Sequence, residues 1–378
     1  MKIVVTIDSF KGTLSSYDAC SIVADRLQSL LPEADVEIVP IADGGEGTIE
    51  ALIAARDGYM CSAGEVTGPL PDMRCEGVYG WLPDDRTAII EMSRVSGLAA
   101  LPENKRNPLH TTTRGTGELI KAAVEGGAER ILLTLGGSAT VDGGTGAARA
   151  LGWSFIGRDG MEVLEGGEGL TAIREIIPPS KSVSVPDVKV LCDVTNPLCG
   201  LRGAATVYGP QKGATPAMVK ELEAGLWNLS ECIVSDLGVG ICDIPGSGAA
   251  GGFGGGAVAF FGGELVPGFE VVAETVGLRE KIQGCDIVIT GEGQLDEQSL
   301  QGKVISGVAD YARASGASTV AVTGRVAVPF NIWKEAGIAE VFETSAQRVG
   351  TPSTEEARKS LSETVERVAY FIRNEDKE

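Results

Sequence analysis

Residues 2–8 read KIVVTID, an apolar run rich in β-branched residues that ends in an aspartate. Such a run is typical of a buried strand. Ser15, with Asp18 three residues later, resembles a capping box and predicts the start of a helix. A second strand is expected over residues 36–42, VEIVPIA, and a second helix over residues 48–55. Alternating strands and helices indicate an α/β unit with a parallel sheet.

The C-terminal third repeats this style. Strands are expected at CDIVITG (285–291) and STVAVTG (318–324), with a helix between them at residues 303–316. Residues 354–373 predict a final amphipathic helix, whose apolar face comprises Leu361, Val365, Val368 and Ile372. A chain of 378 residues exceeds one ordinary core, so two or three domains are expected. One sheet built from both chain ends around an insertion fits the pattern, and two sequential α/β domains fit it as well.

The middle of the chain is less regular. The predicted strands are RTAIIE (86–91), RILLTLGG (130–137) and VKVLCDV (188–194), and the predicted helices cover residues 114–127 and 216–230. The glycine-rich stretch over residues 245–263 is either a loop that admits close backbone approach or the start of a tightly packed helix. Its pattern does not separate the two.

Charge and residue usage exclude several function classes. The net charge of −20 disfavours a nucleic-acid partner, because the surface repels phosphate backbones. The eight cysteines have no CxxC spacing, so neither a zinc ribbon nor a redox motif is indicated. The first ten residues lack the apolar run of a signal peptide or membrane span, so we expect a cytoplasmic location with reduced thiols. The single histidine, His110, excludes a two-histidine metal site and any serine-histidine-aspartate scheme that does not use it.

Carboxylates follow several predicted strands. They are Asp8, Asp43, Asp193, Glu292 and Asp296. Ligands of open α/β sheets bind beyond the carboxyl ends of the strands. Any one of these acids could instead cap a helix or form a turn. Together they indicate a functional cluster, which could bind Mg²⁺ through oxygen ligands.

Glycine-rich loops supply the second half of this chemistry. Three such loops could present backbone N–H groups to phosphates: GGEGT (44–48), GGSATVDGGTG (136–146) and GSGAAGGFGGG (246–256). Lys11 or Lys212 could neutralise the phosphate charge; the alternative for each lysine is a solvated position on the surface. Carboxylates, phosphate-binding loops and lysines suggest phosphoryl transfer. The GxxxxGK[ST] and HRD kinase signatures are absent. A nucleotide-dependent oxidoreductase and a non-catalytic organic-acid-binding protein are the alternative functions.

Eight motifs in a fixed order resemble those of the bacterial glycerate kinase family, of the glycerate 2-kinase type. They are DSFKGTLSS, ADGGEGT, TRGTGELI, LGGSATVDGGTGAARALG, CDVTNPLCG, YGPQKGA, PGSGAAGGFGGG and VITGEGQLDEQSLQGK. The resemblance runs from residue 1 to about residue 330. It implies a phosphotransferase that acts on an alcohol group. It also implies that ATP and Mg²⁺ are used and that D-glycerate is phosphorylated at its 2-hydroxyl, in sugar-acid catabolism. The expected oligomeric state is a monomer or a homodimer. Arg114 and Val141 stand where the family often has Tyr and Asn.

The resemblance also implies a two-domain α/β architecture. A flavodoxin-like parallel-sheet domain would comprise residues 1–80 and 265–378. An inserted restriction-endonuclease-like domain would comprise residues 81–264. This arrangement agrees with the similarity of the two ends of the chain.

Roles for individual residues follow as hypotheses from the strand ends and the matched motifs. We expect Asp193 to be the catalytic base, with Asp296 as a second candidate and Lys11 as a catalytic cation. Asp43, Asp193 and Asp296 are the candidate metal ligands. The expected substrate contacts are Asp8, Ser9, Asp43, Gly44, Gly45, Glu46 and Arg114. The expected nucleotide or phosphate contacts are Gly136, Gly137, Ser138, Asp142, Lys212 and Gly291.

Overall fold

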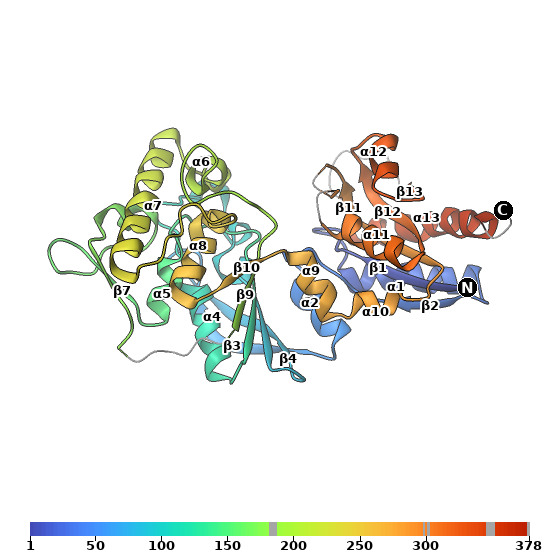
Figure 1. Ribbon diagram of the computed structural model, residues 1–378, viewed down its shortest axis with the longest axis horizontal. Coiled ribbons are helices and arrows are strands. Elements are labelled where there is room, and N and C mark those ends of the chain that lie inside the picture. Colours follow the sequence, from blue (N-terminus) through green and yellow to red (C-terminus); the bar gives the residue numbers. More distant parts are fainter. Residues whose placement is uncertain (181–186, 298, 301–302, 345–351, 376–378) are drawn as a thin grey trace. The chain divides into compact units, whose positions relative to one another are not determined.

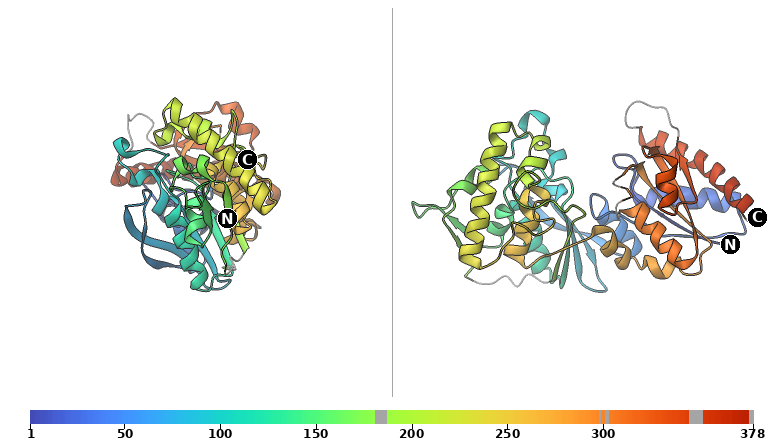
Figure 2. Two further views of the ribbon diagram at one scale, coloured as in Figure 1. Left: turned by 90° about the vertical axis from the view of Figure 1, so that its left-hand side faces the viewer. Right: turned by 45° about the horizontal axis from the view of Figure 1, so that its top comes forward.

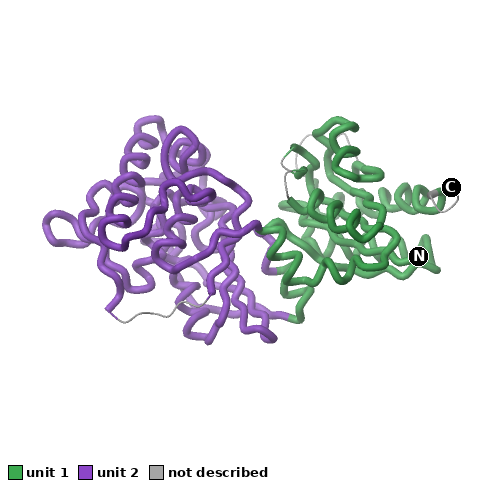
Figure 3. The backbone as a smooth tube through the Cα atoms, in the orientation of Figure 1, with its two compact units in different colours: residues 1–43, 50–57, 268–378 green, residues 44–49, 58–267 purple. Residues whose placement is uncertain are grey.

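The structure is a computed structural model that describes residues 1–180, 187–297, 299–300, 303–344 and 352–375. The chain divides into two compact units (Figure 3): unit 1 is residues 1–43, 50–57 and 268–378, and unit 2 is residues 44–49 and 58–267. Both ends of the chain therefore belong to unit 1 (Figure 1). Within the last quoted motif, Gln298, Gln301 and Gly302 lie outside the described residues.

Unit 1 is a parallel sheet covered by helices. Its strands are β1 (Lys2–Ile7), β2 (Asp35–Ile38), β11 (Ile287–Leu295), β12 (Ser318–Val326) and β13 (Glu340–Glu343). They lie in the order β13-β12-β11-β1-β2, and every pair is parallel. Its helices are α1 (Ser16–Leu30), most of α2 (Thr48–Ala55), α9 (Gly268–Thr275), α10 (Leu278–Ile282), α11 (Val304–Ser315), α12 (Phe330–Glu335) and α13 (Thr354–Glu375).

Helices cover both faces of this sheet (Figures 1 and 2). On one face, α1 and α13 pack on alternate residues of β1 such as Ile3 and Val5. On the other face, Ile305 of α11 and Trp333 of α12 pack against Ala321 of β12. A parallel sheet buried on both faces explains the continuous apolar run of β1.

Three predictions about the unit 1 helices are confirmed by the structure. The Ser15 hydroxyl accepts a hydrogen bond from the N–H of Asp18, as the capping pattern predicted. The apolar face predicted for α13 is confirmed, because its four residues are fully buried: Leu361, Val365, Val368 and Ile372. Each such side chain contributes about 1.5–3 kcal/mol by leaving water. The helix predicted over residues 48–55 is α2.

The second strand is shorter than predicted. β2 ends at Ile38 instead of running to residue 42. Val39 still donates a hydrogen bond to the carbonyl of Val5, but Pro40 has no N–H with which to continue the ladder. Asp43 therefore lies in a loop five residues beyond the strand.

Unit 2 contains a mixed sheet and most of the remaining helices. Its strand order is β10 (Glu264–Val266), β9 (Asp187–Leu191), β6 (Arg130–Thr134), β5 (Thr87–Glu91), β4 (Arg74–Leu82) and β3 (Tyr59–Thr67). A separate hairpin joins β7 (Ser154–Ile156) and β8 (Glu175–Ile177). The α-helices are α3 (Ser93–Ser96), α4 (Arg114–Glu125), α5 (Thr145–Ala150), α6 (Ala204–Tyr208), α7 (Pro216–Leu237) and α8 (Ala249–Phe261). Short 3-10 turns are η1 (Leu98–Ala100), η2 (Glu103–Lys105), η3 (Gly167–Ala172) and η4 (Pro210–Lys212).

The boundary between the units differs from the one expected near residue 80. β3 and β4 are antiparallel and pair onto β5, so residues 58–80 extend the sheet of unit 2. The return to unit 1 falls at residue 268 instead of residue 265. The sequence of β3 and β4 does not show which of the two sheets they join, because strand pairing is decided by tertiary packing.

The glycine-rich stretch combines the two readings that its pattern left open. It contains α8, whose first turn is broken by positive φ angles at Ala250, Gly251 and Gly252. At Gly251 a Cβ atom would lie 2.0 Å from the carbonyl oxygen of Thr140. The glycines therefore let this kinked helix start approach the neighbouring loop backbone to backbone.

Gly117 provides a test of packing in unit 2. A Cβ atom on this residue of α4 would lie 2.3 Å from the carbonyl oxygen and 2.5 Å from the Cα of Ala147 in α5. Both contacts are with backbone, so α4 and α5 would have to separate. We expect Gly117→Ala to lower the free energy of unfolding by about 1–3 kcal/mol in urea titrations, despite the higher helix propensity of alanine.

The matched control is Gly240→Ala, since no atom lies within 4 Å of a Cβ built there. This substitution is expected to change stability by no more than about 0.5 kcal/mol. Equal unfolding midpoints for the two variants would show that the α4–α5 contact tolerates a methyl group.

Candidate active site

Carboxylates gather at the carboxyl edge of the unit 1 sheet. Asp8 directly follows β1, and its N–H donates to the carbonyl of Gly291 at 2.9 Å. Glu292 lies in the neighbouring strand β11, and Asp296 directly follows that strand. Asp43 comes to the same edge from the loop after β2, close enough for its charge to raise the pKa of Asp8. The structure thus brings together the four strand-end acids that belong to unit 1.

Two lysines face Asp43. The Lys11 Nζ lies 3.5 Å from the Asp43 Oδ2, and the Lys303 Nζ lies 4.0 Å from the same oxygen. The charge of Asp43 is the main cause that raises the pKa of Lys11. Lys303, just before α11, was missed by the sequence analysis. Its QGK context gave no signal because it does not match a phosphate-binding loop.

Asp8 is buried, with 2% of its surface exposed. Burial is the main cause that raises its pKa well above the usual range, and the neighbouring charge of Asp43 adds to the shift. Its Oδ1 accepts a hydrogen bond of 2.6 Å from the N–H of Ser9. Ser9 therefore orients Asp8 through its backbone.

Asp296 serves the turn that follows β11. Its Oδ1 accepts hydrogen bonds from the N–H and the hydroxyl of Ser299 at 3.2 and 3.3 Å. Its Oδ2 accepts from the Gln294 side-chain amide at 3.3 Å. This is the turn-forming role that the sequence analysis kept as an alternative for each acid.

Glu292 is half-buried and differs from Asp296 in its partners. Its Oε1 is buried and has no hydrogen-bond partner among the residues that the structure describes. Burial raises the pKa of Glu292 to about 7, opposed by the Ser299 hydroxyl and the charge of Lys303. The sequence placed Glu292 at a strand end but gave no reason to prefer it over Asp296.

Gly291 has a packing role in the sheet. A Cβ atom there would lie 2.0 Å from the carbonyl oxygen of Val322 in β12. Its own carbonyl accepts from Asp8, as described above. The glycine is thus required by close strand approach, whether or not a phosphate lies near it.

In unit 2, the loops GGEGT (44–48) and LGGSATVDGG (135–144) approach backbone to backbone. A Cβ atom on Gly136 would lie 3.4 Å from the Cα of Gly45 and 4.0 Å from the N of Glu46. The Thr48 hydroxyl donates to the carbonyl of Gly45 at 2.8 Å, which fixes the loop at the start of α2. Gly44 has a φ of +84°, a conformation that favours glycine.

The start of α2 is also tied to β5. Glu91 is 1% exposed at the end of β5, and its Oε1 accepts from the N–H of Ile49 at 3.0 Å. Its Oε2 accepts from the Arg94 Nε at 2.9 Å. The sequence analysis missed this pair, because the link joins residues that are far apart in the chain.

Asp142 is the buried centre of the loop after β6. Its Oδ2 accepts from the N–H and hydroxyl of Thr113, both at 2.8 Å, and from the N–H of Gly146 at 3.2 Å. Its Oδ1 accepts from the N–H of Gly144 at 3.1 Å. Burial raises the pKa of Asp142, and the hydrogen bonds from Thr113 oppose that shift. These donors point at a protein carboxylate, so here the carboxylate occupies the place expected for a bound anion.

Lys212 lies beneath the same loop. It is 2% exposed, and its Nζ donates to the Ser138 hydroxyl and to the carbonyl of Thr140, both at 2.8 Å. Burial lowers its pKa to about 7. Gly136 and Gly137, by contrast, are exposed. The loop thus has an exposed glycine tip supported from within by a buried lysine.

The remaining candidates lie elsewhere in unit 2. Arg114 starts α4, and its guanidinium pairs with Glu165 through an Nε–Oε1 distance of 2.8 Å. Asp193 is exposed two residues after β9. Because Asp43 and Asp296 belong to unit 1, no single unit holds the three expected metal ligands. Over the described ranges, no group of three or more His, Cys, Asp or Glu side chains is arranged to hold a metal ion.

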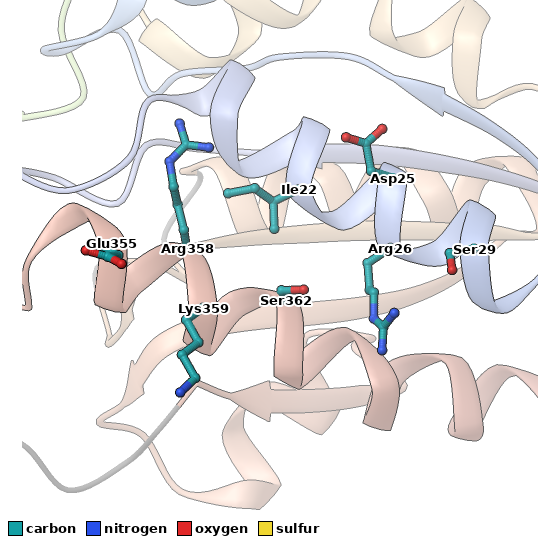
Figure 4. A pocket seen from close by; sticks show the side chains of 8 residues that line it. All are labelled: Ile22, Asp25, Arg26, Ser29, Glu355, Arg358, Lys359 and Ser362. Atoms are coloured by element: carbon teal, nitrogen blue, oxygen red, sulfur yellow. The ribbon is translucent and has the colours of Figure 1, made fainter.

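A hollow of about 590 Å³ lies elsewhere, over α1 and α13 (Figure 4). It is lined by Ile22, Asp25, Arg26, Ser29, Glu355, Arg358, Lys359 and Ser362. Its two arginines are paired with protein carboxylates, Arg26 with Glu366 and Arg358 with Asp18. None of the lining residues is a candidate active-site residue, so this hollow does not compete with the carboxyl edge as the site.

Comparisons with known proteins identify the family to which this chain belongs. The family model described as "Glycerate kinase family" matches residues 3–373. A glycerate 2-kinase of Escherichia coli K12 is 43% identical over 344 residues, 90% of each chain. A glycerate kinase of Bacillus subtilis 168 is 39% identical over 374 residues, 98% of this chain and 97% of that protein. The crystal structure of a "putative glycerate kinase 2" from Salmonella typhimurium LT2 is 38% identical, with a TM-score of 0.89 and complete coverage of both chains. The chain therefore belongs to the glycerate kinase family of enzymes.

Proposed function

We propose that this protein transfers the γ-phosphoryl group of ATP to the 2-hydroxyl of D-glycerate, in the catabolism of sugar acids. Membership of the glycerate kinase family and a relative named glycerate 2-kinase support the reaction. The observation that carries the proposal is the cluster at the carboxyl edge of unit 1, where Lys11 and Lys303 face Asp43 beside the buried Asp8 and the half-buried Glu292. This edge is where open α/β sheets bind their ligands.

Phosphoryl transfer needs positioning and charge neutralisation more than covalent chemistry. Lys11 and Lys303 are cations that can meet a carboxylate or a phosphate, and Asp43 holds both of them in place. Ser9 and Asp8 offer hydrogen bonds to the hydroxyl groups of a small sugar acid. These are the substrate contacts that we propose in unit 1.

We propose that the exposed tip formed by Gly136 and Gly137 contacts the phosphates of ATP through its amides. Ser138 adds a hydroxyl whose oxygen already accepts from Lys212 and whose hydrogen can be donated to an anion. Asp142 and Lys212 support this loop from within. Gly45 and Glu46, whose backbone atoms lie near Gly136, extend the same proposed surface together with Gly44.

Arg114 and Asp193 stay proposals for substrate binding and proton transfer. The half-buried ion pair of Arg114 with Glu165 gives it a structural reason to be present. Asp193 is an exposed carboxylate two residues beyond β9.

Mg²⁺ is expected on chemical grounds, since it neutralises nucleotide phosphates. The residues proposed for it do not fit a preformed site. Asp43 is paired with two lysines, Asp296 is occupied by its turn, and Asp193 lies in the other unit. We therefore assign no protein ligand to the ion and no step of the reaction to it.

Two finer assignments accompany the function. The all-parallel order β2-β1-β11-β12-β13 in unit 1 corresponds to 2-1-3-4-5 and supports a flavodoxin-like classification. A restriction-endonuclease-like classification is proposed for unit 2 from the family resemblance alone.

The part of the chain that the structure describes contains no helix of the length and apolarity needed to cross a membrane. All eight cysteines are free, which supports a proposed reducing, cytoplasmic setting for a monomer or homodimer.

The proposed function is tested by a coupled assay that follows ADP release in the presence of D-glycerate, ATP and Mg²⁺. NMR of the product then distinguishes 2-phosphoglycerate, which we expect, from 3-phosphoglycerate. Lack of glycerate-dependent ADP release would refute the proposal. A change in nicotinamide absorbance with glycerate would favour the oxidoreductase instead.

A further inference from the structure

The acids at the carboxyl edge of unit 1 differ in what occupies their oxygens. Asp43 faces two ammonium groups, Asp8 accepts from the N–H of Ser9, and Asp296 accepts three hydrogen bonds within its turn. Glu292 alone among them has a buried oxygen, Oε1, that finds no partner within the described residues. A buried acceptor without a partner is costly and calls for an explanation, for which a bound ligand is one candidate.

We propose that Glu292 is the general base that accepts the proton of the glycerate hydroxyl, an assignment that rests on the proposed kinase function. Glu292 lies in β11, the middle strand of the unit 1 sheet, with β1 and Asp8 on one side. Gly291 and Gly293 flank it, and a Cβ atom on Gly293 would meet nothing nearer than backbone atoms of the Lys11 loop at 3.8 Å. The charge of Glu292 also contributes to the raised pKa of Lys11, so its carboxylate lies within electrostatic reach of the lysine that we assign to the substrate.

The proposed step is balanced without a further reactant. The hydroxyl oxygen of glycerate forms a bond to the γ-phosphorus of ATP as its proton passes to a carboxylate oxygen of Glu292. The bond between the γ-phosphorus and the bridging oxygen breaks, and its electron pair leaves with ADP. Glu292 returns the proton to solvent when the products leave.

The charges around Glu292 suit this task. The groups that interact with it are Asp8, Lys11, Asp43, Asp296, Ser299 and Lys303. Burial, with smaller contributions from Asp43 and Asp296, raises its pKa to about 7, while Ser299 and Lys303 lower it. A base is most effective when its pKa lies near the working pH. Asp296 instead accepts hydrogen bonds at both carboxylate oxygens from within its own turn.

The test is Glu292→Gln, which keeps the shape of the side chain and removes the basic oxygen. We expect kcat to fall by about 10²–10⁴-fold while the KM for ATP and the melting temperature stay close to wild type. In the wild-type protein, kcat/KM should rise with pH through about 7 and then level, and this rise should disappear in the variant. Glu297→Gln is the matched control, because Glu297 is exposed and lies only five residues away.

Each result decides the assignment. If wild-type protein phosphorylates D-glycerate and Glu292→Gln keeps kcat within tenfold, Glu292 is not the base, although the proposed function stands. A large loss of kcat with an unchanged pH profile would make Glu292 a positioning residue and would also overturn the assignment. If the wild-type protein releases no ADP with D-glycerate, the function and the base assignment fall together.

Discussion

Asp142→Ala is expected to lower the free energy of unfolding of unit 2 by about 4 kcal/mol. The carboxylate of Asp142 accepts hydrogen bonds from the N–H groups of Thr113, Gly144 and Gly146 and from the Thr113 hydroxyl, all in the buried interior. Alanine would leave these donors without a partner, and each buried unsatisfied donor costs about 1–3 kcal/mol. Some of the loss would be recovered by water entering the space left by the side chain.

Asparagine provides the graded comparison. In Asp142→Asn, the amide oxygen can still accept from Thr113 and Gly146, whereas the amide nitrogen would face the N–H of Gly144. We therefore expect a loss of about 2 kcal/mol, between the wild-type and the alanine proteins. Asp72→Asn makes the same chemical change at an exposed turn and is expected to cost less than about 0.5 kcal/mol.

Urea unfolding followed by tryptophan fluorescence suits this measurement. Trp81, Trp153 and Trp227 belong to unit 2, and Trp333 is the remaining tryptophan of the chain. The signal therefore reports chiefly on the unit that contains Asp142. If Asp142→Ala unfolds at the wild-type urea concentration, the buried carboxylate does not organise the loop.

The α/β alternation could be predicted from local sequence, because strand runs and helix caps are local signals. The Ser15 cap and the apolar face of α13 are examples that the structure confirms. The early end of β2 at Ile38 follows from Pro40, a signal that was present in the sequence but not used. The allocation of residues 58–80 to unit 2 depends on strand pairing, which no local pattern specifies.

The candidate site was predictable to the extent that strand ends meet at one edge of a sheet. That rule grouped Asp8, Asp43, Glu292 and Asp296, which all belong to unit 1, but it also included Asp193, which belongs to unit 2. It could not rank the acids, since the orphaned oxygen of Glu292 and the occupied oxygens of Asp296 appear only when side chains are placed. Lys303 was missed for the same reason, because its partner Asp43 is 260 positions away in the chain.

The glycine-rich motifs show the limit of motif reading most clearly. Loops that look like phosphate cradles also arise where backbones must approach closely. Gly251 and Gly256 would bring a Cβ atom within 2.0 Å of the Thr140 carbonyl and 2.2 Å of the Gly143 carbonyl. Much of the glycine content of unit 2 therefore serves loop-on-loop packing, which leaves the exposed pair Gly136 and Gly137 as the better candidates for contact with a ligand.

The stability of the wild-type protein relative to Lys212→Met is expected to rise steeply with pH above about 7. Lys212 is buried, and burial lowers its pKa from the ordinary 10.5 to about 7 in the folded protein. Below about pH 7, both the folded and the unfolded chain carry the proton, and stability does not depend on this group. Between about pH 7 and 10, the unfolded chain binds one more proton than the folded chain, so the free energy of unfolding rises with pH.

The size of this effect follows from the shift. Each pKa unit corresponds to about 1.4 kcal/mol, so the wild-type protein should gain on the order of 4 kcal/mol over the variant across that window. Lys212→Met also loses the hydrogen bonds to Ser138 and Thr140, but that loss is the same at every pH. Urea unfolding of both proteins at several pH values therefore separates the two contributions, because only the slope reports the buried amine.

Lys220→Met is the control, since Lys220 is an exposed lysine on α7 and its removal should leave the slope unchanged. Parallel stability curves for the wild-type and Lys212→Met proteins would mean that water reaches the Lys212 ammonium in solution, which would restore it as a candidate phosphate ligand. A slope that disappears in Lys212→Met alone would mean that Lys212 acts as a buried support of the loop. A neutral amine still has two N–H groups, enough to donate to both Ser138 and Thr140, so the support would persist at the pH where the charge is lost.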